Sequence, residues 1–246
     1  MTSQNRAAAP RLGLILAAGF GSRLESATGE LKLKPLLPVA GRPLILRVID
    51  GMLRVGCSKI VVVTGFAGEE LRQAIRQSYD GAAELVFVDN PNFRLSNGLS
   101  VYAAREHLTQ SFILSMADHV VSPKIMDLAA QHAAPSNGAT LLVDRKIAGV
   151  FDLDDATKVK THDGKIVAIG KQLTEYDCID TGVFVCTAGL VEAIAKVAEA
   201  KGDASLSEGV QALAGRGEME VLDVGDAQWM DVDTPEMLAD AEARLR

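Results

Sequence analysis

Apolar runs of strand length alternate with amphipathic helical patterns along the first half of this chain. The first run, Leu12–Ala17, is apolar at nearly every position, which is typical of a strand covered on both faces of a parallel sheet. Further strands are predicted at 59–64, 84–89 and 112–116, and helices at 44–53, 69–78 and 99–107. This alternation predicts βαβ units with right-handed crossovers, and therefore an α/β fold built on a mostly parallel sheet flanked by helices.

The pattern changes after about residue 140. Strands are predicted at 140–143, 183–186 and 218–222, and helices at 190–200 and 235–245, the last with Thr234 as its N-cap. Asp163-Gly164 separates two short strand patterns, which is typical of a β-hairpin with a two-residue turn. We therefore expect a flexible tail over residues 1–10 and a single domain over residues 11–246 with an inserted β-hairpin lobe.

The composition argues against several classes of protein. With 25 Lys and Arg against 32 Asp and Glu, the formal net charge is −7, which argues against a nucleic-acid-binding groove. No apolar run is long enough to span a membrane, and the first ten residues lack the apolar core of a signal peptide, so a cytoplasmic protein is expected. Cys57, Cys178 and Cys186 form no C-x-x-C pair and are expected to be buried, reduced thiols.

A glycine-rich loop follows the first strand, at the place where α/β sheets bind nucleotides. It lacks the third glycine of the dinucleotide fingerprint, because Leu24 stands there, and it lacks the G-x-x-x-x-G-K-[ST] pattern of a P-loop. Gly19 and Gly21 allow backbone N–H groups to approach phosphate oxygens, while Arg23 and Lys34 supply positive charge. These residues predict a site for a nucleoside triphosphate; the alternative is a tight strand–helix turn beside a solvated arginine.

Two segments, L-A-A-G-F-G-S-R-L and K-P-L-L-P-V, resemble the signature of nucleotidyltransferases that join a nucleoside triphosphate to a sugar phosphate or alcohol phosphate. Over about residues 11–240, further blocks resemble the CTP:inositol-1-phosphate cytidylyltransferase family. They are V-V-T-G-F at 62–66, N-P at 90–91, S-N-G-L-S at 96–100, A-D-H at 117–119, D-A-T-K-V at 155–159, I-G-K at 169–171, D-T-G at 180–182 and W-M-D-V-D-T-P-E at 229–236.

The resemblance implies a Rossmann-like, GT-A-like fold, with a nucleotide-binding half at about residues 11–140 and an acceptor-binding half at about residues 141–246. It also implies Mg²⁺-dependent transfer of CMP from CTP to a phosphorylated alcohol, with inositol 1-phosphate as the expected acceptor. The products would be a CDP-alcohol, for polar-lipid head-group synthesis, and pyrophosphate. Some family members are fused to a membrane-bound lipid transferase. No such segment is expected in this sequence, so a separate membrane-bound CDP-alcohol transferase is expected downstream. The oligomeric state, a homo-oligomer included, stays open.

The resemblance further implies roles at individual positions of the nucleotide half. The nucleotide is expected to contact Leu16, Ala17, Ala18, Gly19, Gly21, Ser22, Arg23, Lys34, Thr64, Gly65, Asn97, Gly98 and Ser100. Arg23 and Lys34 are the expected catalytic residues, because they would neutralise the charge of the phosphates. For Asn97 and Gly98, an ordinary turn is the alternative.

Two aspartates are expected to hold Mg²⁺, which prefers one or two carboxylates together with phosphate oxygens and water. Asp118 ends an apolar strand pattern and matches the metal aspartate of the family; its alternative role is capping the following turn. Asp231 and Asp233 alternate along an extended segment, so only one of them can face the metal. Asp233 matches the second ligand of the family better, with Asp231 in reserve, although Asp233 could instead cap the last helix.

The acceptor phosphate is expected to bind cations from the second half of the chain. Lys171, in I-G-K, matches an acceptor-phosphate lysine of related enzymes, and the other acceptor candidates are Arg145, Lys146, Lys158, Asp180 and Thr181. Each of the lysines could instead be a solvated surface charge. A phosphate monoester is mostly dianionic at pH 7, so no general base is required. His119, next to Asp118, is expected to be structural or to support a metal ligand without binding the metal itself.

Other functions stay open as alternatives. The same chemistry could use UTP, dTTP or GTP, or could act on phosphoglycerate, glycerol phosphate or phosphocholine. An aromatic content of 4% counts against an aromatic cage for choline, and extra cations near Lys171 would favour an acceptor that carries a carboxylate. A nucleotide-binding regulator without catalysis and a purely structural α/β domain are the alternatives from other classes.

Overall fold

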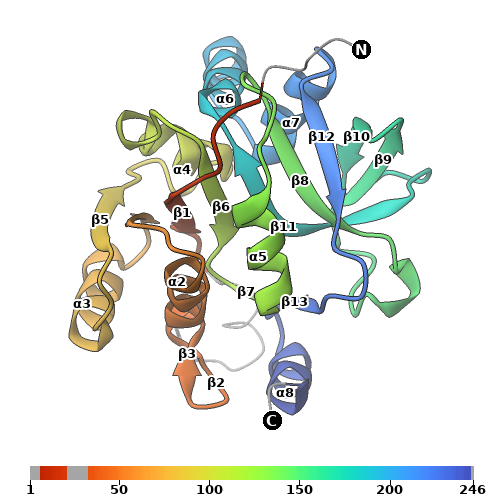
Figure 1. Cartoon of the computed structure of the whole chain (residues 1–246). Coiled ribbons are helices and arrows are strands. Elements are labelled where there is room, and N and C mark those ends of the chain that lie inside the picture. The colour runs from red at the N-terminus through yellow and green to blue at the C-terminus, as the bar shows by residue number, and fades with distance from the viewer. Residues whose placement is uncertain (1–5, 21–32, 245–246) are drawn as a thin grey trace.

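The computed structural model describes residues 6–20 and 33–244. In these residues, nine strands form one mixed sheet in the order β5–β4–β1–β6–β11–β8–β12–β10–β9 (Figure 1). The strands are β1 (Leu12–Ala17), β4 (Lys59–Thr64), β5 (Glu84–Asp89), β6 (Phe112–Met116), β8 (Ala139–Asp144), β9 (Lys158–His162), β10 (Lys165–Gly170), β11 (Cys178–Cys186) and β12 (Met219–Asp223). Two short pairs lie outside this sheet: β2 (Pro38–Val39) with β3 (Arg42–Pro43), and β7 (His119–Val121) with β13 (Trp229–Asp231).

Helices cover both faces of the sheet (Figure 1). One face carries α2 (Leu44–Arg54), α3 (Gly68–Ser78) and α5 (Pro123–Gln131), and the other carries α4 (Gly98–Ala103), α6 (Ala188–Lys201) and α7 (Leu206–Ala214). Because strand side chains alternate, Leu12, Leu14 and Leu16 of β1 pack toward α4, α6 and α7, whereas Ile15 and Ala17 pack toward α2, α3 and α5. The last helix, α8 (Pro235–Arg244), contributes to a smaller apolar cluster with β2 and β13. The expected α/β architecture is confirmed.

One edge of the sheet collects the loops that matter for the site. β5, β4, β1 and β6 are mutually parallel, so their carboxyl ends meet at this edge. Gly19 follows β1 there, Gly65 follows β4, and Asp118 follows β6. β11 runs antiparallel to β6 with Val183 opposite Ser115, so the earlier residues of β11, including Asp180, extend past the end of β6.

The strands of the second half close into a ring. β11 pairs with β8, β8 with β12, β12 with β10 and β10 with β9, and β9 returns to pair with β11 at Cys178 and Ile179. The predicted hairpin β9–β10 is present, and its turn residues Asp163 and Gly164 both have positive φ. Because ring closure pairs the strand edges, the hairpin is an integral part of the sheet.

Several elements differ from the sequence expectation. β11 begins at Cys178, well before the start that the sequence pattern predicts. The pattern misses the first residues because a bulge between Asp180 and Phe184, with Gly182 at φ +76°, interrupts the alternation of side chains. The expected helix over 99–107 is the short α4 followed by a 3₁₀ turn at Arg105–His107. α5 and α7 have no counterpart in the sequence expectation, although a capping box of Ser205 and Glu208 opens α7.

The two ends of the described chain are both tied to the domain. Arg6 forms an ion pair with Glu220 (2.7 Å), and Ala7 N donates to the carbonyl of Ala134 (3.0 Å). Residues 6 and 7, within the expected tail, thus contact the domain, and residues 1–5 lie outside the described residues. At the other end, Thr234 Oγ1 accepts from Met237 N (3.3 Å), as its expected capping role requires. Within residues 6–20 and 33–244, no helix combines the length and apolarity needed to cross a membrane.

Candidate active site

A short two-stranded ladder gathers three aspartates at the carboxyl edge of the sheet. β7 starts directly after Asp118 and pairs antiparallel with β13, so that His119 lies opposite Asp231. The backbone N–H of Val232 donates to the carbonyl oxygen of Asp118 (3.0 Å). Asp118, Asp231 and Asp233 are therefore brought together from distant parts of the sequence.

The ammonium group of Lys34 lies between two of these aspartates. Its Nζ is 2.5 Å from Asp118 Oδ2 and also donates to Asp233 Oδ1. Burial by itself would lower the pKa of Lys34, but the two carboxylates outweigh burial and the net pKa is raised. Two carboxylates thus converge on one positive charge, and Lys34 stays protonated at neutral pH.

His119 binds the other oxygen of Asp118. Its Nδ1 is 2.8 Å from Asp118 Oδ1, and its ring stacks on the ring of Trp229. Burial would raise the pKa of Asp118, but Lys34 and His119 hold that pKa well below its usual range. Asp231 differs, because burial raises its pKa. Of these two carboxyl groups, Asp118 is therefore the one most firmly held as an anion.

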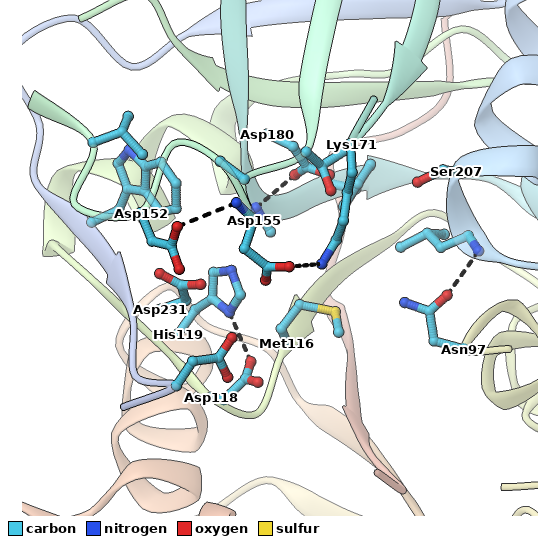
Figure 2. A pocket seen from close by; sticks show the side chains of 18 residues that line it. Asn97, Met116, Asp118, His119, Asp152, Asp155, Lys171, Asp180, Ser207 and Asp231 are labelled. Atoms are coloured by element: carbon cyan, nitrogen blue, oxygen red, sulfur yellow. Dashed lines mark hydrogen bonds and ion pairs between the residues drawn. The ribbon is translucent and has the colours of Figure 1, made fainter. Parts of the chain in front are cut away.

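A cavity of about 240 Å³ opens beside the ladder (Figure 2). Its described lining consists of Asn97, Met116, Asp118, His119, Val150, Asp152, Asp155, Ala156, Thr157, Lys171, Asp180, Gly182, Phe184, Leu206, Ser207, Trp229, Asp231 and Asp233. Lys171 follows β10 and pairs through Nζ with Asp155 Oδ1 (2.7 Å). Figure 2 shows this pair above the side chains of His119 and Asp118. With six aspartates and one lysine among the described lining residues, the cavity is strongly acidic.

Asp180 faces this cavity from the bulged start of β11. The N–H of Gly182 donates to Asp180 Oδ1 (2.7 Å). Burial raises the pKa of Asp180 to about 6, although the Gly182 N–H and His119 act in the opposite direction. A carboxyl group with a raised pKa on the wall of a cavity is typical of a functional position.

The start of the glycine-rich loop is held by the loop after β4. The carbonyl of Ala18 accepts from Phe66 N (3.2 Å), and a Cβ on Gly65 would lie 2.9 Å from that carbonyl oxygen and 2.5 Å from Phe93 Cβ. The rings of Phe20, Phe66 and Phe93 pack together, with centroids 4.9 Å apart for Phe20 and Phe66. The segment that follows β1 therefore packs so closely on Gly65 that no side chain fits at this position.

The structure places the expected nucleotide residues in two groups. Those at the ends of β1 and β4 and beside the ladder are Leu16, Ala17, Ala18, Gly19, Lys34, Thr64 and Gly65. Gly21, Ser22 and Arg23 lie outside the described residues.

Asn97, Gly98 and Ser100 form the second group and make contacts within the protein. Asn97 Oδ1 accepts from Leu206 N (2.9 Å) at the start of α7, and Ser100 Oγ accepts from a buried asparagine amide (3.0 Å). A Cβ on Gly98 would lie 2.5 Å from the carbonyl oxygen of Ala204. Only the side chain of Asn97 joins this segment to α7, and of the three only Asn97 is among the described residues that line the cavity.

Three of the expected acceptor residues are engaged elsewhere in the fold. Arg145 pairs with an aspartate before β11 (2.8 Å), buried Lys158 donates to three backbone carbonyls, and Thr181 Oγ1 donates to a carbonyl of β8 (2.8 Å). None of the three is among the described residues that line the cavity. The structure therefore favours structural roles for them, whereas Lys171 and Asp180 do face the cavity.

Several residues of the cavity make contacts that the sequence analysis did not assign, beyond the supporting role expected of His119. His119 bonds directly to Asp118, Asp155 pairs with Lys171, and Trp229 covers the ring of His119. His119, Asp155 and Trp229 each lie inside a sequence block that carries the family resemblance, and that was the available signal. Asp152 and Ser207 also line the cavity, and no such block contains them.

The carboxylates fit a metal ion that binds together with phosphate. Among the described residues, no group of three or more His, Cys, Asp or Glu side chains is arranged to hold a metal ion. Asp118 and Asp233 nevertheless present oxygens to one point, the Nζ of Lys34. Mg²⁺ is commonly held by one or two carboxylates, substrate phosphates and water. The donor set therefore suits a divalent metal ion that binds together with a triphosphate.

Comparison with known proteins finds relatives that match along almost the whole chain. The chain is 36% identical over 241 residues to the bifunctional IPC transferase and DIPP synthase of Thermococcus kodakarensis and 34% identical over 232 residues to the protein of that name from Aquifex aeolicus. These matches cover 96% and 94% of the chain but 51% of each relative, so the chain spans about half the length of the curated relatives it matches.

A solved structure confirms the expected nucleotidyltransferase fold. The inositol-1-phosphate CTP transferase from T. maritima superposes with a TM-score of 0.82 at 25% identity, covering 96% of this chain and 98% of that one. The MobA-like NTP transferase domain matches residues 13–215. The chain therefore belongs to the MobA-like NTP transferase family.

Proposed function

We propose that this chain transfers CMP from CTP to a phosphorylated polyol, with inositol 1-phosphate as the acceptor, and releases pyrophosphate. The observation that carries the proposal is the convergence of Asp118 and Asp233 on the ammonium group of Lys34 beside an acidic cavity. The choice of CTP and inositol 1-phosphate is supported by the structural similarity to the inositol-1-phosphate CTP transferase from T. maritima. The product would be a CDP-alcohol, a head-group precursor that a membrane-bound CDP-alcohol transferase would consume.

Nucleotidyl transfer requires neutralisation of charge on the α-phosphate and on the departing pyrophosphate. Asp118 and Asp233 would hold Mg²⁺, which when bound neutralises and orients the triphosphate. Lys34, which its raised pKa keeps protonated, would add a second positive charge beside that ion and would contact the phosphates. Gly19 would expose backbone N–H groups to the phosphates, and Arg23 would contribute a guanidinium.

The acceptor needs no base from the protein. A phosphate monoester has a second pKa near 6 and is mostly dianionic at pH 7, so its oxygen can attack the α-phosphorus directly. The contribution of the chain is then to hold that oxygen in line with the bond to the leaving pyrophosphate. Lys171 would hold the acceptor phosphate, exchanging its ion pair with Asp155 for phosphate oxygens.

The acidic lining supports a hydroxylated acceptor without a carboxylate of its own. Asp152, Asp155 and Asp180 can accept hydrogen bonds from hydroxyl groups and would repel a second negative charge. The described lining near Lys171 contains no further lysine or arginine, which disfavours phosphoglycerate. Its described aromatic side chains, Phe184 and Trp229 beside His119, supply few faces for a choline cage.

A pyrophosphate-release matrix tests the proposal. CTP, UTP, dTTP, GTP and ATP are each combined with Mg²⁺ and with inositol 1-phosphate, glycerol 3-phosphate, phosphoglycerate, phosphocholine or glucose 1-phosphate. We expect release with CTP and inositol 1-phosphate, and a CDP-linked product by mass spectrometry. Release with another nucleotide would overturn the assignment of the base, and binding of CTP without release in any column would support a regulator without catalysis.

Replacing Lys171 tests the acceptor half separately. Lys171→Ala should raise the KM for the acceptor about 10- to 100-fold, because a charge-assisted contact to phosphate contributes about 1.5–3 kcal/mol, and should leave the KM for CTP within about twofold. Steady-state kinetics with each substrate varied in turn measure the two constants. Lys160→Ala, which removes a lysine paired with Glu175 on the hairpin surface, is the matched control. Equal loss for both substrates would contradict an acceptor-specific role.

A further inference from the structure

We propose that His119, Trp229 and Asp144 form an orienting chain that fixes the carboxylate of Asp118 for the metal ion. The inference rests on the proposed function, in which Asp118 holds Mg²⁺. His119, Trp229 and Asp144 would be positioning residues, because they act through Asp118 and not on the substrate. This orienting chain takes one residue from each of three elements: His119 from β7, Trp229 from β13 and Asp144 from β8.

The first link divides the two oxygens of Asp118 between two tasks. Nδ1 of His119 lies 2.8 Å from Oδ1, whereas Oδ2 faces the Nζ of Lys34 (2.5 Å). A carboxylate on the loop after a strand has two side-chain torsions to fix. With Oδ1 bound to the imidazole, the direction of Oδ2 is set, and Oδ2 is the oxygen that converges with Asp233 Oδ1 on one point.

The second link, formed by Trp229 and Gly182, restricts the position of the imidazole ring. The rings of His119 and Trp229 are nearly parallel, 9° apart, with centroids separated by 6.1 Å. Against the ring edge lies Gly182, where a Cβ would come within 2.6 Å of His119 Cδ2. Gly182 also has a φ of +76°, which favours glycine. The histidine ring is thus packed between an indole and a stretch of backbone that excludes any side chain.

The third link fixes the indole. Trp229 Nε1 donates to Asp144 Oδ2 (2.9 Å), and Asp144 is buried, with 5% of its surface exposed. Asp144 Oδ1 in turn accepts from the backbone N–H of Lys146 (2.8 Å). Rotation of the indole would leave a buried carboxylate oxygen without its donor, which costs about 1–3 kcal/mol. The position of Trp229 is therefore tied to the end of β8.

The reason for such a chain lies in the chemistry of metal ligands. Residues that hydrogen-bond to a ligand fix its orientation, and their loss typically lowers metal affinity or activity about 10- to 100-fold. Asp118 needs this support because the described site offers two converging carboxylates and no larger protein cage. A small rotation of one of two carboxylate ligands would remove half of the protein's contacts with the metal ion.

Binding of Mn²⁺ in the presence of CTP and without acceptor tests the orienting chain, since no turnover is needed. Water-proton relaxation gives the affinity for Mn²⁺ in wild type, His119→Ala, His119→Asn and Trp229→Phe. We expect His119→Ala to weaken Mn²⁺ binding about 10- to 100-fold. His119→Asn should stay within a few-fold of wild type, because its amide can donate from nearly the position of Nδ1. Trp229→Phe keeps an aromatic face but loses the N–H, and should fall between them.

Controls and contrary outcomes separate this inference from the proposed function. His162→Ala, at an exposed hairpin position, should bind Mn²⁺ like wild type, and thermal unfolding shows that each variant is folded. Unchanged Mn²⁺ affinity in His119→Ala, or equal weakening in His119→Ala and His119→Asn, would overturn the orienting chain. If pyrophosphate release fails with every acceptor while His119→Ala still weakens Mn²⁺ binding, the proposed function fails and the orienting chain stands. Wild type that binds no Mn²⁺ overturns both.

Discussion

Asp118→Asn and Asp233→Asn are each expected to lower kcat for pyrophosphate release by about 10²–10³ with CTP, Mg²⁺ and inositol 1-phosphate, because each removes half of a convergent anionic pair. Both carboxylates contact the Nζ of Lys34, so an amide at either position leaves one charge where two are needed. Initial rates at saturating CTP and acceptor, measured over a range of Mg²⁺ concentrations, give kcat and the half-activating concentration of Mg²⁺. That concentration should rise in both variants.

Two further variants sharpen this result. Asp231→Asn should lose much less activity, because Asp231 has a raised pKa and because Asp233, not Asp231, accepts a hydrogen bond from the Nζ of Lys34. Asp226→Asn, at an exposed surface position, is the matched control and should behave like wild type. If Asp231→Asn were as severe as Asp118→Asn while Asp233→Asn stayed active, the second ligand would be Asp231.

Asp180→Asn is expected to raise the free energy of unfolding at pH 8 and to raise the KM for the acceptor. Burial raises the pKa of Asp180 to about 6, against about 4 in an unfolded chain, so the folded state binds this proton more tightly. The contribution of Asp180 is therefore least favourable above pH 6, where the buried group is ionised, and improves as the pH falls from 6 toward 4. At pH 8 the amide should raise the free energy of unfolding by about 1–3 kcal/mol, and the Tm by several degrees.

Function should move the other way in the same variant. Asp180 Oδ1 is held by the N–H of Gly182, and the carboxyl group faces the cavity where acceptor hydroxyls would bind. Its loss should raise the acceptor KM about tenfold or more, with little change in the KM for CTP. Thermal unfolding at pH 8 and pH 4.5 shows whether the stability difference shrinks in acid. A lower Tm at pH 8 would show that the carboxylate is a structural element and not a ligand-binding group.

The parallel half of the fold was predictable because its signal is local. β1, β4, β5 and β6 have the expected bounds. β1, β4 and β6 are buried on both faces and read as continuous apolar runs, and the half-buried edge strand β5 still has an apolar run between two acidic residues. β7 and β13 have three residues each and no periodicity of their own. They form because two distant segments pair, so a single sequence gives no local sign of them.

The site was predictable only where family blocks mark it. Asp118 and Asp233 were paired through the resemblance, and the structure shows both of them at the ammonium group of Lys34. Their spacing in the sequence does not by itself indicate that the two side chains meet. Lys158 illustrates the opposite outcome. It matches a family block, yet the fold buries its ammonium group among three carbonyls, and residue type cannot distinguish such a lysine from one that faces an acceptor.

The most direct test of the central claim is the fate of CTP itself. ³¹P NMR follows the reaction of CTP, Mg²⁺ and inositol 1-phosphate with wild type and with Asp118→Asn in parallel. We expect the triphosphate signals to be replaced by those of a diphosphodiester and of pyrophosphate in equal amounts with wild type, and to persist with Asp118→Asn. Conversion at the same rate by Asp118→Asn, or wild type that binds CTP and forms no diphosphodiester, would contradict the claim that these carboxylates serve cytidylyl transfer.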